Sequence, residues 1–125
     1  MSRTGMGHLA HQVRVPLPGW MDAPGDVGLD AGIAELIQKL WSLGIETSMS
    51  CEGGPGADGV INDAYIWFAE PDDAWDFARA LTEANGGQPT KLTISAENDQ
   101  ACVMFASSLI PAIVGADLVR LEPPQ

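Results

Sequence analysis

Apolar residues recur with helical spacing in the first half of the chain. Residues 30–44 predict an amphipathic helix, because apolar side chains fall near the i, i+3, i+4 and i+7 positions of one face. The apolar face comprises Ile33, Leu36, Ile37, Leu40, Trp41 and Leu43. We expect Asp30 to accept hydrogen bonds from the first-turn amides and Gly44 to end the helix in the left-handed conformation.

A second amphipathic helix is predicted from Pro71 onward. Proline lacks the amide hydrogen that is unpaired at a helix start, and Asp72 and Asp73 favour the positive end of the helix dipole. Its apolar stripe comprises Ala74, Trp75, Phe77, Ala78 and Leu81. The sequence Asn85-Gly86-Gly87 is expected to end it.

Alternation of polar and apolar residues predicts the strands. Residues 45–51 and 64–69 have this pattern, and residues 91–96 and 101–106 read as a hairpin around a turn at 97–100. Residues 11–15 fit an edge strand. Residues 19–28 form a long loop carrying Trp20 and Met21, which is either functional or docked by these apolar side chains.

The order of these elements predicts one α+β domain spanning residues 1–125. We expect a mainly antiparallel sheet with two amphipathic helices on one face. The expected topology is a ferredoxin-like βαββαβ unit with an extra strand and a short C-terminal helix that ends near Gly115. We expect residues 1–28 to form an irregular N-terminal segment with one possible edge strand, and residues 122–125 to form a loose tail.

The strand alternation also predicts two faces of the sheet. The side under the helices is expected to hold Ile45, Met49, Cys51, Ile66, Phe68, Leu92 and Ile94. The open side is expected to hold Glu46, Ser48, Ser50, Tyr65, Trp67, Thr93 and Ser95. Aromatic side chains beside small hydroxyls suit a subunit interface or a stacked planar ligand, unless the N-terminal segment or the last helix covers them.

Composition and charge narrow the classes of protein. Apolar residues make up 46% of the chain and charged residues 18%, which is typical of a globular fold, and the net charge is -11. This charge repels phosphate backbones and anionic lipids, so we expect neither direct DNA binding nor membrane binding. No signal peptide or membrane span is visible, which favours a cytoplasmic location, or the host cytoplasm if the protein is phage-encoded.

Sequence motifs for catalysis or metal binding are weak. Cys51 is followed by Glu52 and glycines and has no basic neighbour, so a thiol of the core is expected there and at Cys102. His8 and His11 with these cysteines do not have zinc-site spacing, and the aspartates do not follow a calcium-loop pattern. Residues 53–59 lack the Gly-Lys-Ser/Thr ending of a phosphate-binding loop. We therefore expect no metal and no cofactor.

One group of residues remains as a candidate ligand site or interface. It comprises Tyr65, Trp67, Ser48, Ser50, Glu52, Gly53, Gly54 and Arg14. An anionic ligand would require scattered basic residues to be brought together by folding, or across a subunit boundary.

A series of residues between positions 29 and 77 resembles small uncharacterised proteins of actinobacteria and their phages. The resemblance rests on Leu29-Asp30-Ala31-Gly32, Leu40-Trp41, Leu43-Gly44-Ile45, Thr47, Ser50-Cys51-Glu52-Gly53-Gly54, Tyr65-Ile66-Trp67-Phe68 and Ala74-Trp75. It implies a compact α/β domain of phage or mobile-element type and assigns no catalytic residue. The order of helix, Ser-Cys strand and aromatic strand is also similar to phage sponge proteins, which sequester cyclic-nucleotide signals as oligomers.

The resemblance and the residues together lead to one expected function. It is a non-catalytic accessory protein of phage or prophage type, with an anti-defence role. As a homo-oligomer it would bind a small, anionic, nucleotide-like signal or a host protein. One alternative is an enzyme that depends on Cys51 or modifies RNA, since residues 50–53 are similar to an element of a tRNA wybutosine-synthesis methyltransferase family. The other alternative is an acidic mimic of nucleic acid.

Overall fold

The computed structural model describes residues 11–21, 25–55, 58–87 and 92–115, and its centre is a four-stranded antiparallel sheet. The strands, in spatial order, are β3 (Thr47–Cys51), β6 (Ala64–Phe68), β8 (Gln100–Phe105) and β7 (Leu92–Glu97). The possible metal ligand His8 and the expected loose tail at 122–125 lie outside the described residues.

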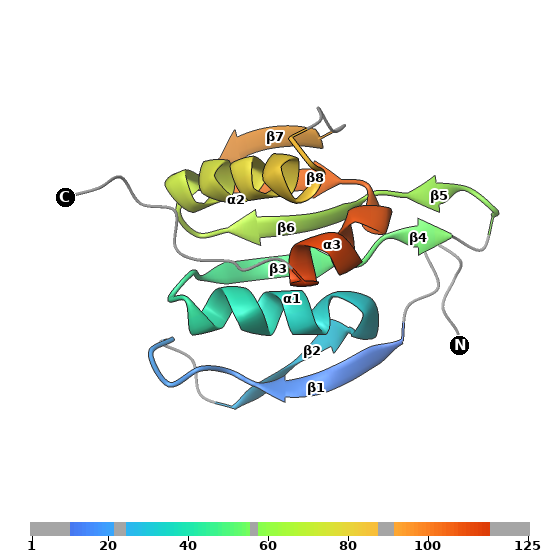
Figure 1. The fold of residues 1–125 in the computed structure, drawn as a ribbon. Helices are drawn as coiled ribbons and strands as arrows, with labels where there is room; N and C mark the ends of the chain where they lie inside the picture. Colours follow the sequence, from blue (N-terminus) through green and yellow to red (C-terminus); the bar gives the residue numbers. More distant parts are fainter. Residues whose placement is uncertain (1–10, 22–24, 56–57, 88–91, 116–125) are drawn as a thin grey trace.

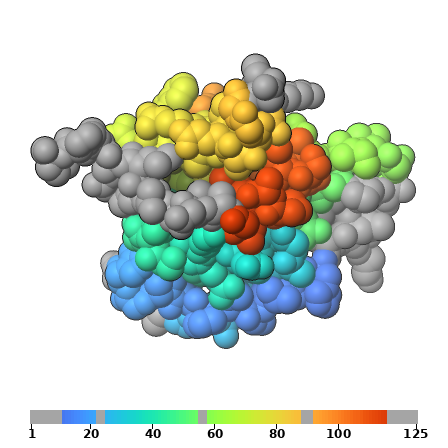
Figure 2. All heavy atoms as spheres, viewed as in Figure 1, coloured from blue at the N-terminus to red at the C-terminus, as the bar shows by residue number. Residues whose placement is uncertain are grey.

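The helices lie on one side of this sheet (Figure 1). They are α1 (Ala31–Ser42), α2 (Pro71–Ala84) and α3 (Ile110–Gly115), the last preceded by the short 3-10 turn η1 (Ser107–Leu109). Helix α3 contacts both longer helices and lies between them, as the space-filling view also shows (Figure 2). The predicted α+β fold, with an antiparallel sheet and helices on one face, is thus confirmed. None of the described helices is long and apolar enough to cross a membrane.

Two small hairpins stand beside the main sheet. Strands β1 (Gln12–Pro16) and β2 (Asp26–Asp30) form one, next to α1, and β4 (Gly54–Pro55) and β5 (Ile61–Asn62) form the other (Figure 1). The N-terminal strand therefore pairs outside the main sheet, and β8 occupies the inner position that the first strand holds in a ferredoxin-like sheet. Residues 26–28 belong to β2, whereas the sequence predicted that they belong to a loop.

The hydrophobic core lies between the main sheet and the helices. Phe77 of α2 contacts Phe68 and Phe105 of the sheet, with ring centroids 5.3 and 5.5 Å apart. The largest fully buried side chains are Phe68, Phe105, Ile33, Leu36, Ile37, Ile66, Leu81, Ile113 and Val103. Trp75, which was predicted to belong to the apolar stripe of α2, is instead 60% exposed. Its position is turned away from the sheet, while the carboxyl-bearing Asp73 is buried.

A β-bulge in β3 changes the side of the sheet to which its later side chains point. Thr47 pairs with Phe68, but the next pair is Met49 with Trp67, so Ser48 is an extra residue without a counterpart on β6. The extra residue reverses the facing of every side chain that follows it. The prediction that Met49 and Cys51 lie on the core face is therefore wrong.

Candidate functional site

The face of the main sheet that points away from the helices carries aromatic and sulfur-containing side chains. Paired residues of antiparallel strands point to the same side of the sheet, so the register assigns the members of this face. We call it the open face, and its residues are Met49, Cys51, Tyr65, Trp67, Thr93, Ser95, Cys102 and Met104. The two aromatic residues lie on the inner strand β6, with a sulfur-bearing residue on either side of each.

The open face is arranged in two rows across the strands. Tyr65 lies between Cys51 and Met104, and Trp67 lies between Met49 and Cys102. Met49 is 58% exposed and Met104 39%, while both aromatic side chains are half-buried. Large flat rings flanked by flexible thioethers form an adaptable apolar surface.

The structure brings together only part of the predicted site. Tyr65 and Trp67 share the open face as expected, but Ser50 pairs with Ile66 and so lies on the core side. Ser48 is the exposed residue of the bulge. The predicted pairing of serine hydroxyls with the two aromatic rings is therefore wrong on β3, because the bulge replaces Ser50 by Cys51 on that face.

Glu52 has a structural role at the start of α1. Its carboxylate oxygen accepts a hydrogen bond of 2.6 Å from the amide of Gly32, and the carbonyl of His11 accepts another from Ala31. Asp30 was expected to cap these amides, but it makes no side-chain capping bond. Its buried carboxylate instead accepts hydrogen bonds from the Glu52 amide and the Gln12 side chain. These hydrogen bonds of Glu52 and Asp30 connect the end of β3 to the start of α1.

Gly53 and Gly54 form the turn that leaves β3. Both have positive φ angles, of 69° and 98°. A Cβ on Gly53 would lie 2.6 Å from the backbone of Asp63 and Ala64, whereas one on Gly54 would meet nothing within 4 Å. Gly53 therefore allows two backbone segments to approach closely, whereas Gly54 provides only the positive φ angle that the turn requires.

The two cysteines have the orientation of the open face and form no disulfide, but Cys51 is half-buried, whereas Cys102 is buried, as the sequence predicted for its thiol. Cys51 pairs with Tyr65 and Cys102 with Trp67 on opposite sides of β6, so two strand spacings and a two-residue offset, roughly 12 Å in all, separate them. Burial raises the pKa of the Cys51 thiol, and the carboxylates of Asp30 and Glu52 raise it further, although a hydrogen bond with the Gly53 backbone acts in the opposite direction. Burial likewise raises the pKa of Cys102. These surroundings stabilise the thiols, which opposes a role as nucleophilic thiolate.

Arg14 does not belong to the main sheet that carries the aromatic pair. It is on β1, where its guanidinium bonds to the carboxylate of Asp26 across the hairpin, and both side chains are more than half exposed. The other basic residues within the described ranges are His11, Lys39 and Arg79, and none belongs to a strand of the main sheet. The described part of the open face is therefore without positive charge.

No cluster of three His, Cys, Asp or Glu side chains suited to a metal ion occurs among the described residues. Thiols and thioethers are frequent on the open face, but in each row an aromatic ring separates the two sulfur-bearing side chains.

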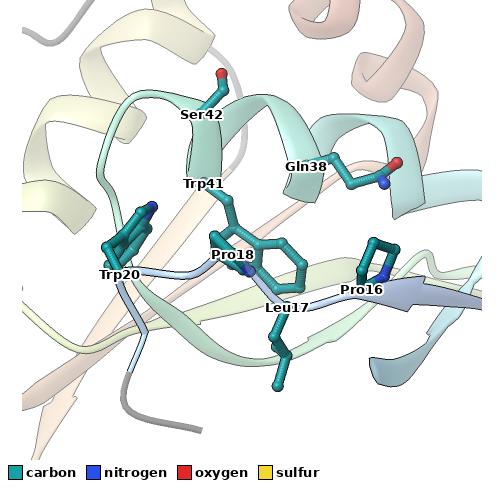
Figure 3. A pocket seen from close by; sticks show the side chains of 7 residues that line it. All are labelled: Pro16, Leu17, Pro18, Trp20, Gln38, Trp41 and Ser42. Atoms are coloured by element: carbon teal, nitrogen blue, oxygen red, sulfur yellow. The ribbon is translucent and has the colours of Figure 1, made fainter. Parts of the chain in front are cut away.

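A shallow groove of about 430 Å³ lies elsewhere, between the loop after β1 and helix α1 (Figure 3). Its lining residues are Pro16, Leu17, Pro18, Trp20, Gln38, Trp41 and Ser42. Trp20 is 49% exposed, whereas Leu17 and Met21 pack against the core, so the loop is docked by some but not all of its apolar residues. The described residues that line the groove are mainly proline and indole rings, and none of them is charged.

No family model, curated protein or solved structure matches the chain.

Sequence reasoning missed the four sulfur-bearing residues of the open face. A signal was present in β8, where Cys102 and Met104 alternate with Val103 and Phe105. If Phe105 is assigned to the core, this alternation places both sulfur residues on the opposite face. No comparable signal marks the bulge in β3, because the local sequence alternates without interruption.

Proposed function

We propose that the protein is a non-catalytic binding protein, of phage or prophage accessory type, which binds a host protein through the open face and works as a homo-oligomer. The single observation that carries this proposal is the aromatic and methionine surface around Tyr65 and Trp67, on the side of the sheet opposite the helices. Exposed apolar surface of this kind marks interaction sites in globular proteins.

The chemistry of the open face favours a protein partner over an anionic nucleotide. Among the described residues the face offers rings, thioethers, the half-buried thiol of Cys51 and hydroxyls but no positive charge that would neutralise a phosphate. Tryptophan and tyrosine dominate the binding energy of many protein interfaces, and methionine adapts its shape to a partner. The complementary partner has an apolar patch bordered by basic residues, which a chain of net charge -11 attracts.

The test compares two tryptophans of similar chemistry on opposite sides of the molecule. Trp67 lies on the open face, and Trp75 lies on α2 with 60% exposure. A photo-crosslinking amino acid is introduced at Met49, beside Trp67, or at Trp75, and each protein is irradiated in an extract of an actinobacterial host. We expect a discrete crosslinked host protein from position 49 only.

The captured protein is then purified and titrated against variants of the full chain. We expect Trp67→Ala to weaken binding at least tenfold, and Trp75→Ala to leave it unchanged, because interface tryptophans typically contribute more than 1.4 kcal/mol. Equal crosslinking from both positions, or equal binding by both variants, would contradict the proposal. Equilibrium dialysis against mixed nucleotides provides the other arm, since a retained nucleotide would favour the small-ligand function instead.

A further inference from the structure

The two edges of the main sheet differ in how they are protected. At one edge, β3 carries the bulge at Ser48, and strand β2 lies against it. At the other edge, β7 pairs with β8 in unbroken register from Leu92 with Phe105 to Glu97 with Gln100. No described strand pairs with the outer side of β7. Natural sheets usually block such an edge with a bulge, a proline or a charge.

The sequence of β7 contains none of these blocking devices before its last residue. Residues 92–96 are Leu-Thr-Ile-Ser-Ala, without charge, proline or glycine, and only Glu97 at the end is charged. This composition is notable in a chain with seventeen acidic and six basic residues. An uncharged, regular edge is the place where two strongly acidic copies can approach with the least repulsion.

The backbone of β7 has its free hydrogen-bonding groups at alternate residues. Asn98 and Asp99 both have positive φ, of 54° and 64°, which defines a two-residue turn closed by a hydrogen-bonded pair of Glu97 and Gln100. Antiparallel pairs alternate between bonded and non-bonded types, so Leu92, Ile94 and Ala96 are at non-bonded positions relative to β8. Their amide and carbonyl groups point toward the outer edge.

We propose that β7 pairs antiparallel with β7 of a second copy of this chain, about a twofold axis at Ile94, to form one eight-stranded sheet. In this register Leu92 lies opposite Ala96 of the second copy, and Ile94 lies opposite its equivalent. All three residues with outward backbone groups are then paired. The two Glu97 residues lie at opposite ends of the ladder, about 20 Å apart, well beyond the screening length of about 8 Å at physiological salt.

The twofold symmetry of this dimer determines how the two open faces are oriented. A twofold axis that relates antiparallel strands of one sheet is perpendicular to the sheet, so both open faces lie on the same side. The dimer therefore presents two surfaces around Tyr65 and Trp67 on the same side of the sheet. Thr93 and Ser95 of both copies lie between these two surfaces. This inference deepens the proposed function, on which it rests for the homo-oligomer, and makes the binding protein bivalent.

The first test measures mass and uses a variant that alters only the outer edge. Ala96 is exposed, and its amide points away from β8, so Ala96→Pro removes an outward donor without removing a hydrogen bond of the β7–β8 ladder. By light scattering we expect twice 13.2 kDa for the wild-type chain and for the control Ala96→Ser, and 13.2 kDa for Ala96→Pro. Added salt should strengthen the wild-type dimer, because it screens the repulsion between two acidic copies. A wild-type mass of 13.2 kDa at high concentration and high salt would overturn the proposal.

The second test requires no variant and remains valid if Ala96→Pro fails to fold. Hydrogen exchange of the wild-type chain is followed by NMR at low and high protein concentration. We expect the amides of Ile94 and Ala96 to become protected only at high concentration, and those of Thr93 and Ser95 to be protected at both. Exchange at Ile94 and Ala96 that does not change with concentration contradicts the dimer.

The two proposals fail in different measurements. Trp67→Ala should retain the doubled mass while losing the host protein, whereas Ala96→Pro should become monomeric and still form the position-49 crosslink. Loss of the crosslink in Trp67→Ala with a monomeric wild-type chain leaves the binding function intact and removes only the dimer. A dimeric chain without any crosslink from position 49 removes the binding function and leaves the dimer intact.

Discussion

The indole nitrogen of Trp41 donates a hydrogen bond of 3.0 Å to the hydroxyl of Thr47, and both side chains are buried. Trp41 belongs to the core face of α1, and Thr47 is the last residue of β3 before the bulge. The bond therefore fixes the helix to the point at which β3 reverses its facing.

Replacement of Thr47 by valine should destabilise the fold by about 1–3 kcal/mol, because the buried Trp41 N–H loses its acceptor while the shape is retained. Urea denaturation monitored by fluorescence measures the change. The control is the same substitution in a Trp41→Phe background, where no donor remains and the loss should largely disappear. An equal loss in both backgrounds would show that the hydrogen bond is not the cause.

Gly53→Ala should destabilise the protein more than Gly54→Ala. Both glycines have positive φ, which costs a residue with a side chain about 1–3 kcal/mol. Only at position 53 does the added Cβ also approach the backbone of Asp63 and Ala64 to 2.6 Å. Thermal unfolding of the two variants measures the difference, and equal midpoints would contradict the close approach.

Glu52 should contribute to stability through α1. Glu52→Ala removes the acceptor for the Gly32 amide and should cost about 0.5–2 kcal/mol. Glu52→Gln retains an accepting oxygen and loses only the charge near the positive end of the helix dipole, so it should cost about 0.3–1 kcal/mol. Denaturant titration distinguishes them. If both variants match the wild-type chain, the contact at Gly32 is not a cap that stabilises the helix.

Cys51 should react slowly with iodoacetamide in the folded protein at neutral pH, more slowly than the same residue in urea, because burial and the nearby acids raise its pKa. Mass spectrometry of the labelled peptides measures both rates, and Cys102 provides an internal comparison. Rapid, selective alkylation of folded Cys51 would instead favour the alternative of a Cys51-dependent enzyme.

The same raised pKa values predict how stability changes with alkaline pH. A thiol whose pKa is raised by folding stabilises the native state fully while it is protonated in both states, and this contribution is lost as the pH rises from the ordinary pKa of 9.0 through the folded value. The free energy of unfolding should therefore fall above pH 9. The fall should be smaller in a Cys51→Ala, Cys102→Ala double variant, and an unchanged slope would contradict the assignment to these thiols.

The sequence by itself determined the two long helices and most strands. Helical periodicity predicted α1 and α2, because the spacing of the apolar residues determines which face of each helix is buried. Gly44, with a φ of 81°, ends α1 as its position in the sequence predicted. Alternation likewise located β3, β6, β7 and β8 and the two open-face aromatics. These are properties of neighbouring residues along the chain.

Only the tertiary structure decided which side chains meet around Tyr65 and Trp67. The bulge at Ser48 arises from pairing with β6, so the local alternation of β3 cannot reveal it, yet it exchanges Ser50 for Met49 and Cys51 on the open face. The hydrogen bond at the start of α1 is also a long-range contact, because its acceptor, Glu52, lies twenty residues from its donor, Gly32, in the sequence. Register and capping across strands depend on which segments pack together, and this information resides in the folded chain as a whole.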